Sequence, residues 1–234
     1  MALPKLNDSP KYTLKIPSSQ KSVRFRPYLV KEEKVLMMAA ETKDTSATMG
    51  AIADTIEACC EGSIDRDSLT TFDIEYMFTK IRAKSSGETA KILMACSDCE
   101  TNNEISIDLD KLDVKMPKVK NIAKLTKDIS VELRYPPFVN LLEYDFQNIN
   151  STETGFSLAA ECIKAIHHNE ERIDVNEVSK KEVVDFLEQM TSEQFKIIME
   201  FMETMPKLEH TAKFKCSACE KPNSQKIEGL NSFF

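Results

Sequence analysis

The sequence predicts an α+β protein, a helical body that carries short β-hairpins, and three observations lead to this class. Segments with apolar residues at helical spacing occupy much of residues 30–86 and 179–205. Short segments in which apolar and polar residues alternate, as in half-buried strands, lie before and between the helical segments. Two Cys-x-x-C pairs lie far apart in the chain, each between strand-like residues. We therefore expect one α+β body in which the cysteine hairpins lie side by side.

The composition is that of an ordinary globular protein, with 41% hydrophobic and 29% charged residues among 234. Length alone permits one or two domains. Glycine is scarce, at five residues, which argues against glycine-rich phosphate sites and tight β-barrels. No run of apolar residues is long enough to predict a membrane span. The N-terminal segment lacks the apolar region of a signal peptide, so we expect a reducing cytosol, where cysteines are more often metal ligands than disulfides.

The net charge of −7 is unevenly distributed. Residues 1–34 hold eight Lys/Arg against three Asp/Glu, a balance of +5, so the remainder carries −12. A basic arm on an acidic body is a poor clamp for DNA, because the body repels phosphate. Such an arm is better suited to docking on an acidic protein surface, although a solvated terminus with no partner explains the charge equally well.

Periodicity and turn residues assign most of the chain to helices and strands. A lysine-rich stretch over 110–128 is expected to be a connector. The best-marked helices begin after Ser179 and Thr191, which lie three residues before Glu182 and Gln194, the capping-box spacing. The expected strands are 12–16, 23–26, 90–95, 104–108, 129–134, 213–215 and 224–227; the expected helices are 30–42, 46–60, 71–85, 137–146, 155–168, 179–190 and 192–205.

The helix at 30–42 is expected to present an apolar stripe made by Val35, Leu36, Met38 and Ala39. Over the whole chain we expect a single domain, residues 1–234, in four parts. These are an extended arm (1–29), helices with the first cysteine hairpin (30–109), a helical middle (110–206), and the second cysteine hairpin with the tail (207–234).

Four of the seven cysteines form the two Cys-x-x-C pairs, Cys96/Cys99 and Cys216/Cys219. The two segments that start at the first cysteine of each pair align without a gap, and serine, glutamate, asparagine and isoleucine recur at matching positions. Each segment, with the residues before it, is predicted to form a strand, a knuckle turn and a second strand. The matching positions are Ser97/Ser217, Glu100/Glu220, Asn103/Asn223 and Ile107/Ile227.

Two such turns supply the four thiolates that a structural zinc ion binds tetrahedrally. We therefore expect one structural Zn²⁺ per chain, held by Cys96, Cys99, Cys216 and Cys219 in a unit that resembles a two-knuckle zinc ribbon. The 116 residues between the pairs are far more than a typical ribbon has, but loop-closure entropy grows only slowly with length. Three alternatives remain: metal-free thiols that merely preserve two hairpins, a site shared between chains, and redox exchange. Redox exchange usually requires an activated cysteine at a helix N-terminus.

The other cysteines, Cys59, Cys60 and Cys162, fall on predicted helix faces and are expected to be buried. His167 and His168 are expected to end a helix, where a cation is favourable. The sequence holds none of the usual hydrolase, phosphate-binding or dinucleotide-binding motifs. Its carboxylates are most simply a solvated face, so we expect no enzymatic activity.

Several segments resemble a known family. Residues 26–36, 72–78 and 81–88 resemble signature segments of the baseplate hub protein family of T-even-type, contractile-tailed phages. Residues 1–6 are similar to members from marine cyanobacterial phages, and residues 227–234 to the family's C-terminus. The likeness covers about 1–109 well, 207–234 fairly well and the helical middle only in outline. Some members of the family lack one or both cysteine pairs, so the zinc prediction rests on this sequence's own residues.

The resemblance implies a hub component or assembly factor that binds other baseplate hub or tail proteins, without a small-molecule substrate or a membrane. It places the protein in the host cytoplasm during assembly, and in the virion tail baseplate if it remains bound. The alternative is a zinc-ribbon nucleic-acid-binding or transcription accessory protein. That class needs basic residues around the knuckles, where this sequence has Lys215, Lys221 and Lys226 among a larger number of acidic residues.

Six residues are candidates for partner binding: Arg24, Phe25, Arg26, Tyr28, Phe233 and Phe234. Pro27 offers no N–H donor, so the second strand should lie at least partly on a sheet edge. Arginine and tyrosine are favoured interface anchors, and two terminal phenylalanines have little reason to persist unless they dock. The alternative is that the aromatic residues pack into the body of the protein.

Overall fold

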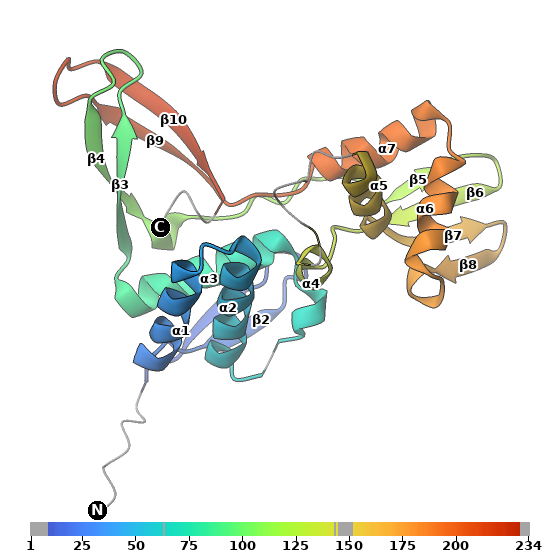
Figure 1. The fold of residues 1–234 in the computed structure, drawn as a ribbon, viewed down its shortest axis with the longest axis horizontal. Helices are drawn as coiled ribbons and strands as arrows, with labels where there is room; N and C mark the ends of the chain where they lie inside the picture. Colours follow the sequence, from blue (N-terminus) through green and yellow to red (C-terminus); the bar gives the residue numbers. More distant parts are fainter. Residues whose placement is uncertain (1–8, 63, 143, 145–151, 230–234) are drawn as a thin grey trace, which may run out of the picture. The chain divides into compact units, whose positions relative to one another are not determined.

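A computed structural model describes residues 9–62, 64–142, 144 and 152–229. Its contacts divide the chain into two compact units (Figure 1). Unit 1 comprises residues 1–66, 72–115 and 207–234, and unit 2 comprises residues 67–71 and 116–206. The mixture of helices and short antiparallel hairpins confirms the predicted α+β class. The single domain expected over residues 1–234 stays a prediction.

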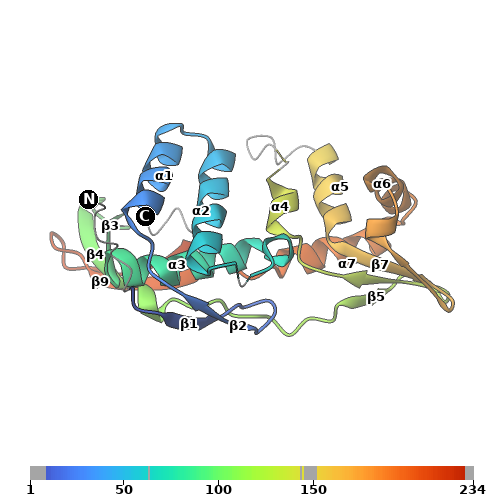
Figure 2. The same cartoon turned by 90° about the horizontal axis from the view of Figure 1, so that it is seen from below.

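In the part of the chain that the structure describes, unit 1 combines three α-helices with three two-stranded hairpins. The β1–β2 hairpin buries Leu14, Val23 and Phe25, as the alternation of apolar and polar residues in the sequence predicts. In Figure 2, α1 and α2 stand side by side on one side of α3, with β1–β2 on the other side. The elements are β1 (Tyr12–Lys15), β2 (Ser22–Phe25), α1 (Val30–Glu41), α2 (Thr45–Cys59), α3 (Thr71–Ser86), β3 (Thr89–Ala95), β4 (Asn102–Asp108), β9 (Glu209–Lys215) and β10 (Pro222–Glu228).

The predicted apolar stripe of α1 faces the interior only in part. Leu36 and Ala39 are half-buried, whereas Val35 and Met38 are 50% and 57% exposed, and the buried residue of this helix is Glu32. Periodicity located the helix and part of its inward face, but not Glu32, which forms an ion pair with Arg26, six residues earlier and outside the helix. The outward face of α1 is consequently rich in apolar side chains.

Unit 2 is an antiparallel sheet of order β5-β6-β7-β8 packed against helices. Its core joins Val131 and Ile163 of the sheet to Leu187 and Ile198 of the helices, all at most 1% exposed. Both predicted capping boxes are present at the N-termini of α6 and α7. The elements are β5 (Ile122–Lys124), β6 (Ile129–Leu133), α4 (Phe138–Leu141), α5 (Thr152–Glu161), β7 (Ile163–His168), β8 (Glu171–Asp174), α6 (Lys180–Glu188) and α7 (Ser192–Glu203).

Two predictions for unit 2 were wrong. The helix expected over 155–168 ends at Glu161, and its second half is strand β7, so His167 and His168 lie in a strand. The expected connector 110–128 contains the short strand β5. Strand β5 pairs with β6 across the short turn 125–128. Strand β7 pairs with β6 from some thirty residues further along the chain, a contact that a local pattern does not reveal. The predicted helix at 137–146 is α4 as far as Leu141, and most of its remainder lies outside the described residues.

None of the helices in the described ranges is both long and apolar enough to cross a membrane.

Neighbouring isoleucines on α7 provide a test of the unit 2 core. Ile198 is fully buried, whereas Ile197 is 37% exposed. We expect Ile198→Ala to lower the free energy of unfolding by about 2–5 kcal/mol, because it removes buried methyl groups and leaves a cavity. Ile197→Ala should change it by about 0.5 kcal/mol or less. Denaturant unfolding followed by far-UV circular dichroism measures both, and equal losses would contradict the assignment of the inward face.

Candidate metal centre

The two cysteine pairs lie in knuckle turns of the same construction. The first joins β3 to β4, with Ala95 opposite Asn102, and the second joins β9 to β10, with Lys215 opposite Pro222. In each turn the N–H of the first cysteine donates to a main-chain oxygen five residues later, at 2.9 Å. A glutamate adopts a positive φ in each: Glu100 at 57° in one turn and Glu220 at 60° in the other. The sequence similarity therefore corresponds to one repeated local structure.

The structure brings all four predicted cysteines together, with their sulfurs within 4.8 Å of one another. Two close distances cross between the hairpins: Cys96 Sγ to Cys219 Sγ is 3.7 Å, and Cys99 Sγ to Cys216 Sγ is 3.6 Å. A metal ion bound tetrahedrally at about 2.3 Å from each sulfur separates the sulfurs by about 3.8 Å. The donor set and its spacing therefore match a tetrahedral zinc–thiolate site.

Main-chain donors favour ionised sulfur at this cluster. The N–H groups of Cys99 and Asp98 lower the pKa of Cys96 to about 6. The pKa of Cys216 is lowered in the same way by N–H groups of its own turn. At Cys219 a main-chain N–H again lowers the pKa, but the neighbouring sulfurs raise it, to about 12 in total. Four thiolates at this spacing repel one another, so ionising all of them together requires a cation.

The remaining cysteines are buried, as expected. Cys59 and Cys162 are fully buried and Cys60 is 1% exposed. Burial raises the pKa of Cys59 to about 11 and that of Cys60 and Cys162 to about 12. They are therefore packing residues, without the thiolate character of a reactive cysteine. Cys162 lies between α5 and β7, not on a helix face.

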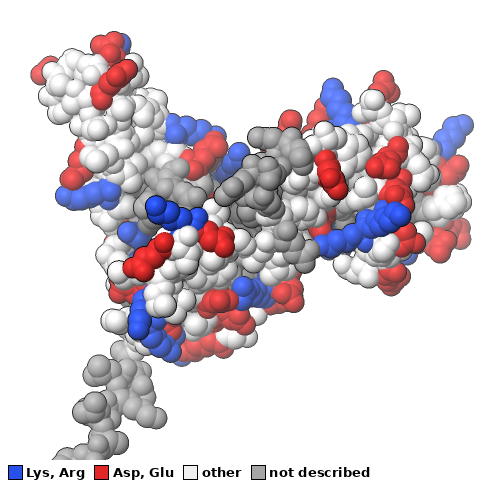
Figure 3. Space-filling view, in the orientation of Figure 1, with Lys and Arg blue, Asp and Glu red and all other residues white. Residues whose placement is uncertain are grey.

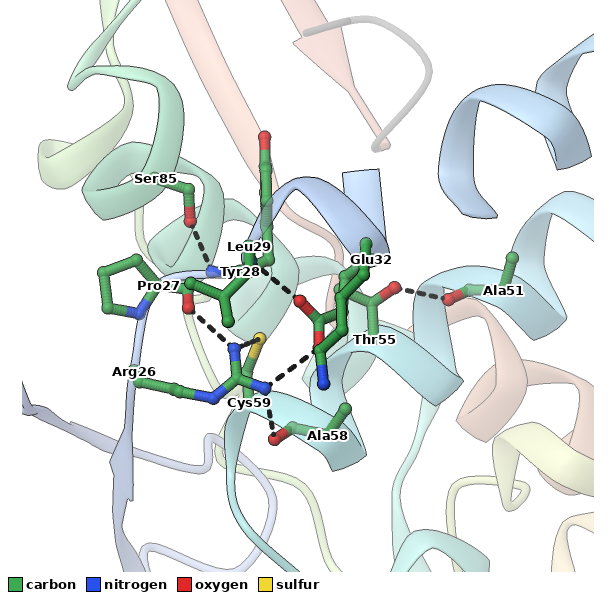
Figure 4. A network of polar contacts seen from close by, with 11 residues as sticks. Arg26, Pro27, Tyr28, Leu29, Glu32, Ala51, Thr55, Ala58, Cys59 and Ser85 are labelled. Atoms are coloured by element: carbon green, nitrogen blue, oxygen red, sulfur yellow. Dashed lines mark hydrogen bonds and ion pairs between the residues drawn. The ribbon is translucent and has the colours of Figure 1, made fainter. Parts of the chain in front are cut away.

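The predicted partner-binding residue Arg26 lies in an internal polar network (Figure 4). Its side chain is 14% exposed and pairs with Glu32, 8% exposed, at 3.0 Å. The guanidinium also donates to the carbonyl oxygens of Pro27 and Ala58, and it lies 3.9 Å from the Cys59 sulfur. This network ties the segment before α1 to the C-terminal end of α2, so Arg26 has an evident structural role.

The other partner-binding candidates differ in exposure. Phe25 is 3% exposed, so it packs into the protein, and Tyr28 is half-buried. Arg24 is exposed and available for contact with another molecule. Phe233 and Phe234 lie outside the described residues. Partner binding by this set stays a prediction, and burial leaves Arg24 as its most accessible described member.

A family model described as T4 bacteriophage base plate protein matches residues 9–234. The chain belongs to this family. Among curated proteins, the baseplate hub assembly protein gp26 of Enterobacteria phage T4 is 26% identical over 136 residues, which are 58% of this chain and 60% of that protein. The chain thus matches about three fifths of the relative's length. No solved structure matches it. The resemblance inferred from the sequence is confirmed.

Two residues of the baseplate protein's cysteine cluster were not assigned a role from the sequence. Asn103 and Asn223 are 6% exposed, and each lies within hydrogen-bonding distance of a cysteine sulfur on the opposite hairpin. The sequence indicated them only by placing an asparagine at the same position of both cysteine hairpins. Asparagine is common near turns, so the coincidence alone did not distinguish these side chains from ordinary turn residues.

The Glu32 carboxylate predicts a pH dependence of stability. Burial alone would raise the pKa of Glu32, but the Arg26 guanidinium and the Leu29 N–H, at 2.8 Å, lower it below its usual value. Because the pKa of Glu32 is lower in the folded state, its ionised carboxylate stabilises the fold at any pH above the unfolded-state pKa of about 4.3. This contribution to the free energy of unfolding is lost as the pH falls through the folded-state pKa.

We expect Glu32→Gln to lower the free energy of unfolding by about 1–3 kcal/mol at pH 7, because it leaves the Arg26 charge without its carboxylate. The difference from the wild type should shrink as the pH falls below about 4.3. Glu33→Gln is the matched control, since Glu33 is the exposed neighbour on the same helix. Denaturant unfolding at several pH values tests this, and a difference that grows on acidification would contradict it.

Proposed function

We propose that this chain is a baseplate hub component or assembly factor that acts through contacts with other hub or tail proteins and is braced by one structural zinc ion. The observation that carries the proposal is the match of residues 9–234 to the baseplate family, together with similarity to a relative named as a hub assembly protein. The proposal includes no enzymatic activity. It places the protein in the host cytoplasm during assembly, and in the virion tail if it remains bound.

The surface of α1 supports a role in binding other proteins. Val30, Met37 and Met38 are 80%, 62% and 57% exposed. Exposed apolar side chains gathered on one element often mark an interaction site, and methionine adapts well to a partner's shape. In a baseplate protein the proposed occupant of this surface is another hub subunit. Arg24 and the terminal phenylalanines remain proposed contacts of the same kind.

The charges around the knuckles favour this proposal over the nucleic-acid alternative. Lys221 pairs with Asp98 at 2.6 Å, and Lys215 pairs with Glu220 at 2.9 Å. Lys226 lies between two carboxylates of the β9–β10 hairpin. Figure 3 shows more acidic than basic side chains at the knuckle end of the hairpins. Lysines already paired with carboxylates form a poor surface for phosphate.

For the zinc ion, we expect native mass spectrometry of reductively purified protein to find one Zn²⁺ per chain. Cys96→Ser or Cys216→Ser should abolish stoichiometric zinc, and strong chelators should lower the thermal unfolding temperature of the wild type, because zinc-binding energy contributes to folding. Cys60→Ala should retain zinc, since Cys60 is buried away from the cluster. A metal-free wild type that unfolds at the same temperature with and without chelator would contradict the proposal.

For partner binding, we expect the chain to co-purify with at least one other hub protein when the hub genes are expressed together. The double change Met37→Glu and Met38→Glu should reduce the recovered partner about tenfold or more, because it places charges in an apolar contact worth about 1.4 kcal/mol or more. Met116→Glu is the control, since Met116 is exposed in the other unit.

In the same assay, Arg24→Glu and deletion of Phe233–Phe234 test the contacts predicted from the sequence. All variants should keep the wild-type circular dichroism spectrum and zinc content. The interaction proposal would be overturned if the wild type bound none of the hub proteins. The assignment to α1 would be overturned if the methionine variant bound as well as Met116→Glu did.

A further inference from the structure

Asn103 on β4 and Asn223 on β10 occupy equivalent positions in the two cysteine hairpins. Both are 6% exposed, although their neighbours along each strand are exposed. The alternation of a strand places Asn103 on the face of its hairpin that also carries the buried Ile107, while Asn102 points the other way. A buried carboxamide is costly unless its oxygen and nitrogen both find partners.

The carboxamide oxygens cross from one hairpin to the other. Asn223 Oδ1 accepts a hydrogen bond from the main-chain N–H of Ser97 at 3.0 Å and from the Ser97 hydroxyl at 2.9 Å. Asn103 Oδ1 accepts from the main-chain N–H of Ser217 at 2.8 Å. Each asparagine therefore binds the residue that follows the first cysteine of the opposite knuckle.

The carboxamide nitrogens complete the arrangement. Asn223 Nδ2 lies 3.5 Å from Cys96 Sγ, and Asn103 Nδ2 lies 3.8 Å from Cys216 Sγ, so each points at a sulfur of the opposite hairpin. The same nitrogens donate to main-chain oxygens of their own turns, at 2.9 Å in one and 2.8 Å in the other. Each asparagine side chain thus contacts its own turn, the main chain of the facing turn and a sulfur of the facing turn.

We propose that Asn103 and Asn223 are positioning residues of the metal centre. They hold the opposing knuckles in register, and their side-chain N–H groups donate to the sulfurs of Cys216 and Cys96, respectively. This rests on the proposed zinc site. The oxygen and nitrogen have separable tasks: the oxygen fixes the facing turn whether or not metal is bound, and the nitrogen supports the sulfur as a ligand. Hydrogen-bonding groups behind metal ligands orient those ligands and tune their affinity.

Zinc affinity of the full chain, measured by competition with a chromophoric chelator, tests the proposal. Asn103→Ala and Asn223→Ala should each weaken zinc binding about 10–100-fold, with Asn223→Ala at least as severe because its nitrogen is closer to the sulfur. The thiolate-to-metal absorption of the Co²⁺-loaded protein should shift in both. Asn102→Ala, an exposed asparagine on the same strand, should match the wild type in both measurements.

Amide hydrogen exchange of the metal-free protein supplies a readout that a general loss of stability would not produce. Asn103→Ala should accelerate exchange at Ser217, and Asn223→Ala at Ser97, each on the hairpin that was not altered. Asn103→Asp retains an oxygen for the Ser217 N–H but replaces the nitrogen donor with a second oxygen. It should preserve protection of Ser217 and still weaken zinc binding, which keeps the test informative if the alanine variants fold poorly.

The outcomes separate the two proposals. A wild-type chain that binds neither zinc nor cobalt would overturn the metal site itself. A wild type that binds metal, with asparagine variants of equal affinity and unchanged cobalt absorption, would overturn the positioning role alone. Exchange that rises only in the altered hairpin, instead of the facing one, would also overturn that role.

Discussion

The meeting of two cysteine pairs separated by 116 residues of chain is the constraint on which the path of the chain depends. Most of unit 2, residues 116–206, is an insertion between the two halves of the cysteine cluster. Val114 and Leu208, at most 7% exposed, form an isolated bridge where the chain leaves unit 1 and returns. The ends of the insertion are thus fixed within unit 1, and its length adds little entropy cost.

Charge explains why this constraint calls for a cation. Main-chain donors in both knuckles favour thiolates, yet sulfurs at 3.6 Å and 3.7 Å across the hairpins oppose full ionisation. A bound divalent cation removes this conflict, and its binding energy then contributes to the pairing of the hairpins. The two asparagines, which are uncharged, also favour pairing of the hairpins. Their carboxamide oxygens link the knuckles through neutral hydrogen bonds to Ser97 and Ser217, which do not involve the sulfurs.

Features set by a short sequence pattern could be predicted from the sequence, and features that depend on contacts outside that pattern could not. Capping boxes at Ser179 and Thr191 and the Cys-x-x-C turns are local, and the structure contains both. Strand β7 was missed because residues before it favour a helix and its partner β6 lies some thirty residues earlier in the chain. The inward face of α1 was assigned only in part, because apolar periodicity does not place a glutamate there, and Glu32 is buried with Arg26, which precedes the helix, as its partner.

The case of Arg26 shows why residue type alone is a weak guide to interaction surfaces. Arginine is enriched at interfaces because its planar guanidinium binds carboxylates and carbonyls well, and the same property suits it to an internal network. Arg26 finds its carboxylate on α1 of its own chain, whereas Arg24, two residues earlier on the alternating strand, remains exposed. By drawing Glu32 inward, the ion pair also turns Met37 and Met38 outward. The interaction that stabilises the α1–α2 pair therefore helps to create the apolar surface proposed to bind another hub subunit.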